Sequence, residues 1–323
     1  MPRRWAARSG MALILTLAAI VLAGGLALYL QARALGLART EQAELLQERL
    51  RLAAAEAARE ALWTLAADQD LAVDHLGEDW ALPRETVHAD GISTRAIVED
   101  AGRFFNWNNL AVSNRATRTS RDILLDLMTF CGDFNPGVRV EALADFVDAD
   151  EKGAYEAPFY GTGEQPFRPP NRELWAPAEL LRVHEFTAEL FQVRPRPGPD
   201  ELFNGNLAAS TVVVPLRLEQ PIPVNVNTAG RDVLMGVVGL QQDTAVQAVL
   251  ALRQMEPLSS LSVLFMANPE LAAALEGTLA TSSNVFRVRA RAACKDQHAA
   301  VLAWVVREQN GDIRILQWLF EEG

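Results

Sequence analysis

The sequence predicts an α+β fold in which one long N-terminal helix packs on an antiparallel sheet that carries a large all-helical insertion. Three observations lead to this fold class. No proline interrupts the stretch of helix-forming residues from Met11 to Asp70. Strand-like alternation occurs before residue 104 and again after residue 284, and helical spacing of apolar residues fills the region between them. Strands and helices that are segregated along the chain in this way are typical of α+β proteins.

The first half of the long helix is apolar enough to cross a membrane. Met11–Leu30 is uncharged, and at about 1.5 Å per residue it spans roughly 30 Å, the thickness of a bilayer core. Gln31–Asp70 continues the helix, with Glu48–Arg51 and Glu56–Arg59 as i,i+3 ion pairs on its polar side. We therefore expect a membrane span that leads into an amphipathic stem.

The charges around the span predict its orientation. Arg3, Arg4 and Arg8 precede it, and the first ten residues contain no acid. The positive-inside bias then places the N-terminus in the cytoplasm and the rest of the chain outside it. The alternative is a cleaved secretory signal with Ala32-Arg33-Ala34 as the cutting site. The retained span is favoured because the apolar run exceeds the roughly 7–15 residues of a typical signal core and the helical pattern continues through the proposed cut.

The rest of the chain divides into helix-like and strand-like segments. Helices are expected at Arg121–Phe130, Arg139–Asp148, Ala178–Phe191, Thr228–Val238, Asp243–Gln254, Leu258–Phe265 and Pro269–Leu275. Strands are expected at Val87–Glu99, Thr211–Leu218, Val285–Ala292, Ala299–Glu308 and Ile313–Phe320. Asn310-Gly311 predicts a two-residue hairpin turn between the last two strands, and Arg194–Pro199 predicts a linker.

Composition and charge exclude several classes of function. The 323 residues include 41 acids and 30 bases, a net charge of −11, which argues against binding to nucleic acid. The charge is +3 in the first ten residues and 27 − 41 = −14 from Met11 onward. The four histidines show no metal-binding spacing, and no nucleophile elbow or triad order is present, so no catalytic residue is assigned. A membrane-anchored periplasmic hydrolase is kept as an alternative.

Two cysteines, Cys131 and Cys294, form at most one disulfide. Both are expected outside the cytoplasm, where a bridge can form. Such a bridge would tie the helical insertion to the C-terminal strands, but the sequence does not show that the two residues meet.

The N-terminus resembles a type IV prepilin leader. In Arg8-Ser9-Gly10-Met11, a short basic segment ends in Gly directly before the apolar span. The resemblance implies that a prepilin peptidase cuts after Gly10 and methylates the new N-terminus, Met11. Most pilins carry Glu at the fifth mature position, where this chain has Leu15. The K-type minor pseudopilins of type II secretion are a subclass that lacks this Glu.

Five further segments resemble the K-type minor pseudopilins, in the same order as in that family. Their letters here are VDHLGEDW, DAGRFFNWNNL, LADFVDAD, FRPPNR followed by EL, and NVNTA, which begin at Val73, Asp100, Leu143, Phe167 and Asn225. One extra Phe in the second segment departs from the family pattern. Each motif is short, but their collinear order covers almost the whole chain. The chain is similar to this family from residue 10 to its last strands.

The resemblance implies a pilin-like head interrupted by helical subdomains. The expected parts are a leader (1–10), a transmembrane helix (11–30), the rest of the stem with the first strands (31–110), a first helical subdomain (111–222), a second of helix-hairpin-helix or SAM-like type (223–283), and the C-terminal strands (284–323). It implies a single-pass inner-membrane protein with a periplasmic head at the tip of the pseudopilus. The implied partners are the I-type and J-type minor pseudopilins, the prepilin peptidase, the inner-membrane secretion platform, secreted substrates and the secretin.

The resemblance also implies bound calcium in the acidic middle of the chain. Ten acids and four bases lie between residues 141 and 185, and clustered carboxylates in a loop suit this ion. The candidate ligands are Asp148, Asp150, Glu151, Glu156, Asn171 and Glu179. The family's acidic G-A-E-D is here Gly153-Ala154-Tyr155-Glu156, which has one carboxylate fewer. The alternative is a solvated acidic loop without a metal.

The NVNTA segment allows a second functional interpretation. Two helices follow it, as in helix-hairpin-helix modules that bind DNA backbones through a G-x-G hairpin. Here the hairpin is Gly239-Leu240-Gln241, which lacks the second Gly, and only Arg231 and Arg253 supply positive charge. A packing role is therefore favoured over DNA binding, with Asn225 and Asn227 as turn and cap residues.

Overall fold

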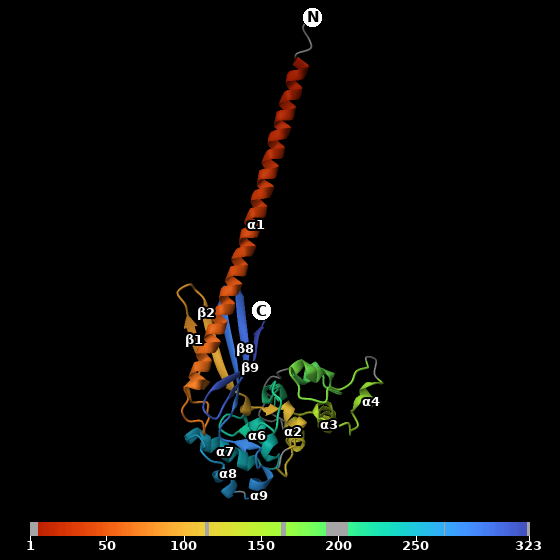
Figure 1. Cartoon of the computed structure of the whole chain (residues 1–323), viewed down its shortest axis with the longest axis vertical. Helices are drawn as coiled ribbons and strands as arrows, with labels where there is room; N and C mark the ends of the chain where they lie inside the picture. Colours follow the sequence, from red (N-terminus) through yellow and green to blue (C-terminus); the bar gives the residue numbers. More distant parts are fainter. Residues whose placement is uncertain (1–5, 114–115, 163–165, 192–205, 268, 322–323) are drawn as a thin grey trace.

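A long helix carries a head made of one sheet and a cluster of helices (Figure 1). The computed structural model describes residues 6–113, 116–162, 166–191, 206–267 and 269–321. The predicted α+β fold is confirmed. The first five residues of the expected leader and the expected linker at Arg194–Pro199 lie outside the described residues.

The N-terminal helix α1 (Ala6–Ala66) is continuous, as predicted, and its first part projects beyond the head (Figure 1). Its apolar segment is long enough to cross a membrane and is not buried by the rest of the chain. The helix ends four residues before the predicted Asp70. The carboxylates of Asp68 and Asp70 accept hydrogen bonds from the N–H groups of Asp70 and Ala72, and these local turns compete with helical pairing.

Five antiparallel strands form the sheet in the order β1-β2-β7-β8-β9. They are β1 (Arg84–Val87), β2 (Ser93–Asp100), β7 (Val285–Cys294), β8 (Gln297–Arg307) and β9 (Ile313–Glu321). The lower part of α1 packs Leu50, Ala54, Ala58 and Leu65 against the inward-facing residues of β2, β7 and β8. The small side chains on this face of α1 allow the helix to approach the sheet closely.

The turn between β8 and β9 differs from the two-residue hairpin that was predicted. Glu308 donates its backbone N–H to the carbonyl of Asp312, so the loop contains Gln309, Asn310 and Gly311. Gly311 has a φ of +85°, whereas Asn310 is not in the left-handed region. A two-residue type I′ turn needs both central residues there, and a single left-handed Gly is typical of the three-residue loop.

The helical part is inserted between the neighbouring strands β2 and β7. Its elements are α2 (Ser120–Phe130), α3 (Pro136–Val147), α4 (Ala157–Tyr160), α5 (Leu207–Ser210), α6 (Arg231–Val238), α7 (Asp243–Met255), α8 (Ser262–Ala267) and α9 (Pro269–Ala274). Short parallel pairs join β3 (Phe105–Asn106) to β4 (Thr211–Val212), and β5 (Val224–Asn225) to β6 (Leu279–Ala280). One hydrophobic cluster runs through the insertion, separate from the core between α1 and the sheet.

Two predicted elements within the insertion are wrong. Ala178–Phe191 is two short 3-10 helices, η4 (Pro177–Arg182) and η5 (Ala188–Phe191), because Glu185 between them has a φ of +67° that no α-helix accommodates. The strand expected at Thr211–Leu218 is limited to β4. Pro215 lacks a backbone N–H for a ladder, and Leu216 turns back to bond the carbonyl of Val214.

Candidate functional site

Three of the predicted calcium ligands meet beside the C-terminal end of α3. Asp148 follows the last turn of α3, Asp150 lies in the next loop, and Glu156 directly precedes α4. One carboxylate oxygen from each lies within 4.8 Å of the other two. Since the chain turns back on itself within eight residues, this proximity depends on the loop conformation.

Asp145 holds that loop in place through a hydrogen bond and a close contact with its backbone. It is buried in the last turn of α3, and its Oδ2 accepts a hydrogen bond of 2.9 Å from the N–H of Tyr155. The Asp145 carboxylate occupies the space where a side chain at residue 153 would begin, so only Gly153 allows the loop to pass over it. The loop therefore brings Glu156 back to Asp148.

Hydrogen bonds and positive charges only partly compensate the three carboxylates. Both oxygens of buried Glu156 and Oδ1 of Asp148 lack hydrogen-bond partners. Burial raises the pKa of Glu156, and the negative charges of Asp145 and Asp148 add to this rise. Burial and Asp150 also raise the pKa of Asp148, against the effect of Arg121, which lies 3.3 Å from its other oxygen. A cluster of hard oxygen donors with orphaned buried atoms fits a divalent cation such as calcium.

The other three predicted ligands have different partners. Glu151 pairs with Arg168 on the surface. Asn171 donates its side-chain amide to the carbonyl of Asp150 at 2.8 Å and so braces the loop. Glu179 accepts hydrogen bonds from the N–H groups at the start of η4 and pairs with Arg172, so it serves as a local cap.

Sequence reasoning missed Asp145 as a member of the acidic cluster. Its spacing of three residues before Asp148 places both on one face of a helix, and this signal was present in the LADFVDAD motif. Tyr155 occupies a position where the family motif has a carboxylate. Its ring stacks on His184 with centroids 5.1 Å apart, so an aromatic contact occupies this position.

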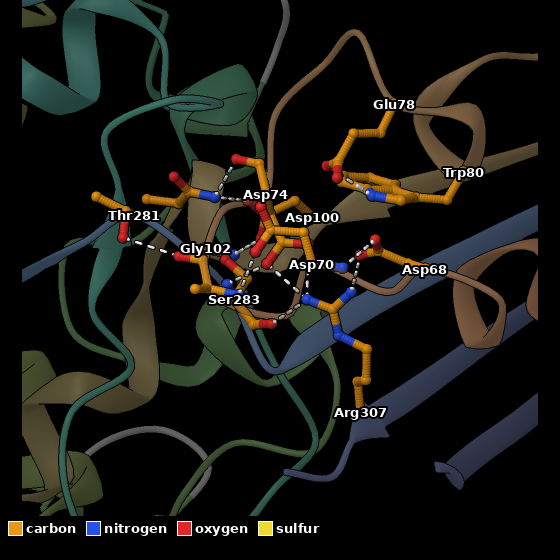
Figure 2. A network of polar contacts seen from close by, with 12 residues as sticks. Asp68, Asp70, Asp74, Glu78, Trp80, Asp100, Gly102, Thr281, Ser283 and Arg307 are labelled. Atoms are coloured by element: carbon orange, nitrogen blue, oxygen red, sulfur yellow. Dashed lines mark hydrogen bonds and ion pairs between the residues drawn. The ribbon is translucent and has the colours of Figure 1, made fainter. Parts of the chain in front are cut away.

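A second acidic group, Asp68, Asp74 and Glu78, lies where the end of α1 meets the insertion (Figure 2). Arg307, at the end of β8, already pairs with two of these three carboxylates. Its guanidinium donates to Asp68 at 2.7 Å and to both oxygens of Asp74 at 2.6 Å. Burial nevertheless raises the pKa of Asp74 to about 7, against the opposing effect of Arg307. With an arginine inside it, this group has no place for a metal ion.

Motif residues from distant segments converge on this network. Asp100 at the end of β2 accepts hydrogen bonds from Gly102, Asn225 and Thr228, the last two belonging to the NVNTA segment. Asn225 also donates to the carbonyl of Asp74 at 3.0 Å. Burial raises the pKa of Asp100. These residues connect the sheet to the insertion, and their role is structural.

The arginines that could contact DNA in a helix-hairpin-helix module have partners within this protein. Arg253 donates to the carbonyls of Val226 and Ala229, and Arg231 pairs with Asp243. Asn225 accepts a hydrogen bond from the N–H of Asn227, the turn role expected of it. This stretch therefore packs within the insertion.

The disulfide that the sequence left possible between Cys131 and Cys294 is not formed. Cys131 packs against the core of the insertion, whereas Cys294 packs against the core between α1 and the sheet. Gly10 and Met11, the expected cleavage and methylation positions, both lie within α1.

Comparison with solved structures identifies the fold. The chain matches one in the crystal structure of the GspK-GspI-GspJ complex from the type 2 secretion system of enterotoxigenic Escherichia coli, with a TM-score of 0.67 and 21% sequence identity. The match covers 88% of this chain and 100% of that chain. The chain has a pilin-like fold. Because the insertion makes up more than half of the chain, a match of this extent includes both the pilin-like head and the insertion. No family model and no curated protein matches the sequence.

Proposed function

We propose that this protein is a K-type minor pseudopilin of a type II secretion system. The observation that carries the proposal is the fold match, which includes the helical insertion between β2 and β7 as well as the pilin-like head. The collinear motifs support it, because their residues form the network that connects the two parts. The function is structural: the chain takes part in an assembly and catalyses no reaction.

The proposed location follows from α1 and the charges around it. The apolar segment is anchored in the inner membrane, with the N-terminus in the cytoplasm and the acidic head in the periplasm. At the tip of the pseudopilus the head would bind the I-type and J-type pseudopilins, help to initiate assembly on the inner-membrane platform, and meet secreted substrates and the secretin. Export of folded proteins across the outer membrane is the resulting activity.

The experiment is a deletion and rescue of the native gene. A strain without this chain is expected to stop secreting its type II substrates, and the full-length chain is expected to restore secretion and to co-purify with the I-type and J-type pseudopilins. Unchanged secretion in the deletion strain, together with no co-purification, would refute the proposed function.

Leader processing is part of the proposal. We infer that the prepilin peptidase cuts between Gly10 and Met11 and methylates Met11. Mass spectrometry of the chain from membranes is expected to show N-methyl-Met11 as the first residue. Detection of an intact Met1, or of an N-terminus after Ala34, would contradict it.

We further propose that Asp148, Asp150 and Glu156 bind one calcium ion, with Asp145 holding the loop in place. The ion would neutralise three neighbouring carboxylates and satisfy the orphaned oxygens of Glu156 and Asp148. In calorimetric titration of the full-length protein in detergent, we expect binding that Glu156→Gln abolishes. Glu151→Gln is the matched control, since Glu151 lies in the same loop but pairs with Arg168. Equal binding by both variants, or no heat in the wild type, would reject this site.

A further inference from the structure

The loop of residues 67–78, which follows α1, is bonded to the segment on which the chain returns from the insertion to the sheet (Figure 2). That segment ends at Val285, where β7 begins. The backbone N–H of Asp74 donates to the carbonyl of Thr281 at 2.9 Å, and Oδ2 of Asp74 accepts a hydrogen bond of 2.7 Å from the N–H of Ser283. The hydroxyl of Thr281 also donates to the carbonyl of Ala72 at 3.0 Å.

The same loop is connected to the point where the chain leaves the sheet. Asp100 ends β2, and its Oδ1 accepts a hydrogen bond of 2.6 Å from the N–H of Gly102. The side-chain amide of Asn225 donates both to the carbonyl of Asp74 and to Oδ2 of Asp100, in each case at 3.0 Å. The loop after α1 therefore holds both connections between the sheet and the insertion.

These contacts enclose more negative than positive charge. Asp74 and Asp100 are fully buried, and the carboxylates of Asp68 and Glu78 lie beside that of Asp74. Arg307 pairs with Asp68 and Asp74, whereas the groups that bond Asp100 in the described part of the chain are neutral. Burial of a carboxylate disfavours its charged form. It raises the pKa of Asp74 to about 7, against the effect of Arg307, and raises the pKa of Asp100.

The charged and titratable groups around Asp74 come from the loop after α1 and from the ends of two strands. They are Asp68, Asp70, His75, Glu78, Asp100, Arg307 and Glu308. The insertion bonds this loop through neutral groups, among them Asn225 and the carbonyl of Thr281. A change in the protonation of Asp74 is therefore felt directly at the contacts that hold the insertion.

A cavity of about 830 Å³ borders this network. It is lined by Leu71 from the loop, Ile222 from the insertion and Arg307 from β8, among others. A polar cavity of this size has room for water. A proton released from the network thus has a route to solvent, and the loop has space in which to move.

We propose that the loop after α1 is a pH-dependent switch that controls how the insertion is held against the sheet. In the closed state Asp74 and Asp100 together retain one proton. Release of this proton to water in the cavity leaves an uncompensated buried charge, and the loop separates from Ser283 and Asn225 so that the charge becomes hydrated. The hydrophobic cluster that includes Val212, Val214, Val285 and Trp304 keeps the insertion attached, so the insertion changes its orientation without unfolding.

The closed state is favoured at low pH, and the switch opens as the pH rises. In the open state the hydrated Asp74 returns to its ordinary pKa of about 3.8, whereas in the closed state its pKa is about 7. The closed state therefore binds more protons between these two values. The ratio of open to closed molecules is expected to rise by up to about tenfold per pH unit between about pH 4 and 7, and to stay constant above about pH 7.

The test is double electron–electron resonance of the full-length protein in detergent, in a background with Cys131→Ser and Cys294→Ser. Spin labels are attached in Val87→Cys and Met255→Cys, because both positions are exposed and lie on β1 of the sheet and α7 of the insertion. The distance between these labels is expected to gain a second population between about pH 5 and pH 8. A label pair in Phe134→Cys and Met255→Cys lies within the insertion and is expected to keep one distance at both pH values.

Two variants identify the group that titrates. Asp74→Asn carries a neutral side chain of similar shape and is expected to remain in the closed population at both pH values. Glu78→Gln is the matched control. The carboxylate of Glu78 belongs to the same acidic group but accepts its hydrogen bonds from His75 and Trp80, so the response of the wild type is expected to persist.

The switch is wrong if the distance between positions 87 and 255 in the wild type is the same at both pH values. It is also wrong if the response persists in Asp74→Asn or disappears in Glu78→Gln. A change between positions 134 and 255 would place the motion inside the insertion and likewise reject it. The thermal midpoint of Asp74→Asn shows whether this variant folds, and the wild-type measurement decides the question if it does not.

Discussion

Arg307 places its guanidinium between Asp68 and Asp74, and its side chain is only 2% exposed. Replacement by Ala would leave Asp74 buried near Asp100 without a counter-charge, and the loss of one partner of a buried pair costs about 3–5 kcal/mol. Chemical denaturation of Arg307→Ala in detergent at about pH 8, above the pKa of Asp74, is expected to show a loss of that order. Arg314→Ala is the control, because its ion pair with Glu308 is exposed and worth at most about 1 kcal/mol. Similar stability of the two variants would contradict the role given to Arg307.

Asp74 gives this network a pH dependence whose sign can be worked out. Its pKa is about 7 in the folded protein and about 3.8 in the unfolded chain, so the folded state binds more protons between these values. The free energy of unfolding is therefore expected to fall as the pH rises from about 4 to 7, by at most about 4 kcal/mol, and to level off above 7. Asp100 and Glu156, whose pKa values burial also raises, add to the same trend.

Denaturation curves between pH 4 and 8 in the presence of a chelator measure this dependence. Asp74→Asn is expected to reduce the slope without abolishing it, because Asp100 and Glu156 still titrate. A stability that rises with pH across this range would show that Arg307 keeps Asp74 ionised, and would overturn the prediction.

At the scale of single elements, the β8–β9 turn depends on Gly311. Its φ of +85° is unfavourable for a residue with a Cβ atom, so Gly311→Ala is expected to destabilise the head by about 1 kcal/mol. Gly137 lies inside α3, and an added Cβ there would meet open space. Gly137→Ala is thus expected to stabilise the protein by roughly 0.5–1 kcal/mol. Thermal unfolding midpoints that shift in the same direction for both variants would contradict this account.

Elements with a clear period were predictable, and those that depend on distant contacts were not. The apolar period sufficed for α2 and α7 and for β7 and β8, because each buries one face, and the uninterrupted run of helix-forming residues sufficed for α1. The positive φ of Glu185, which interrupts the expected helix at Ala178–Phe191, has no local signature. In the acidic cluster, composition identified Asp148, Asp150 and Glu156 but also Glu179, because a count of carboxylates does not show that Glu179 caps η4.

The contacts made by the motif residues could also not be predicted from the sequence. Asn108 donates its side-chain amide to the carbonyls of Leu174 and Val214, residues that are 66 and 106 positions away. Asp100 and Asn225 meet across 125 positions. Collinear motifs showed that such residues matter as a set, but only the folded chain shows that they connect the sheet to the insertion.

At the scale of the whole molecule, the insertion leaves and re-enters the sheet between two strands that pair with each other. A third hydrophobic cluster, which includes Val212, Val214, Val285 and Trp304, packs the insertion against β7 and β8 between the two larger cores. The candidate calcium loop lies between α3 and α4, on the side of the insertion away from α1 (Figure 1). The buried network around Arg307 lies between the two larger cores. A disturbance in one core should therefore spread to the other through this network and through the hydrophobic cluster beside it.

Native-state hydrogen exchange of the full-length protein in detergent tests this arrangement. If the proposed calcium ion is bound, its removal with a chelator is expected to increase amide exchange in α3 and α4, because the carboxylates of Asp148 and Glu156 would then repel each other beside both helices. Exchange in the part of β7 and β8 that packs on α1, at Val288, Ala290, Val301 and Ala303, is expected to stay unchanged, since these residues bury their side chains against α1 rather than against the insertion. In Arg307→Ala, by contrast, amide exchange is expected to increase in both the sheet and the insertion. Arg307 belongs to β8 and pairs with Asp74, whose carbonyl accepts a hydrogen bond from Asn225 of the insertion. Calcium removal that loosens the sheet as much as α3 and α4 would mean that the two cores unfold as one unit.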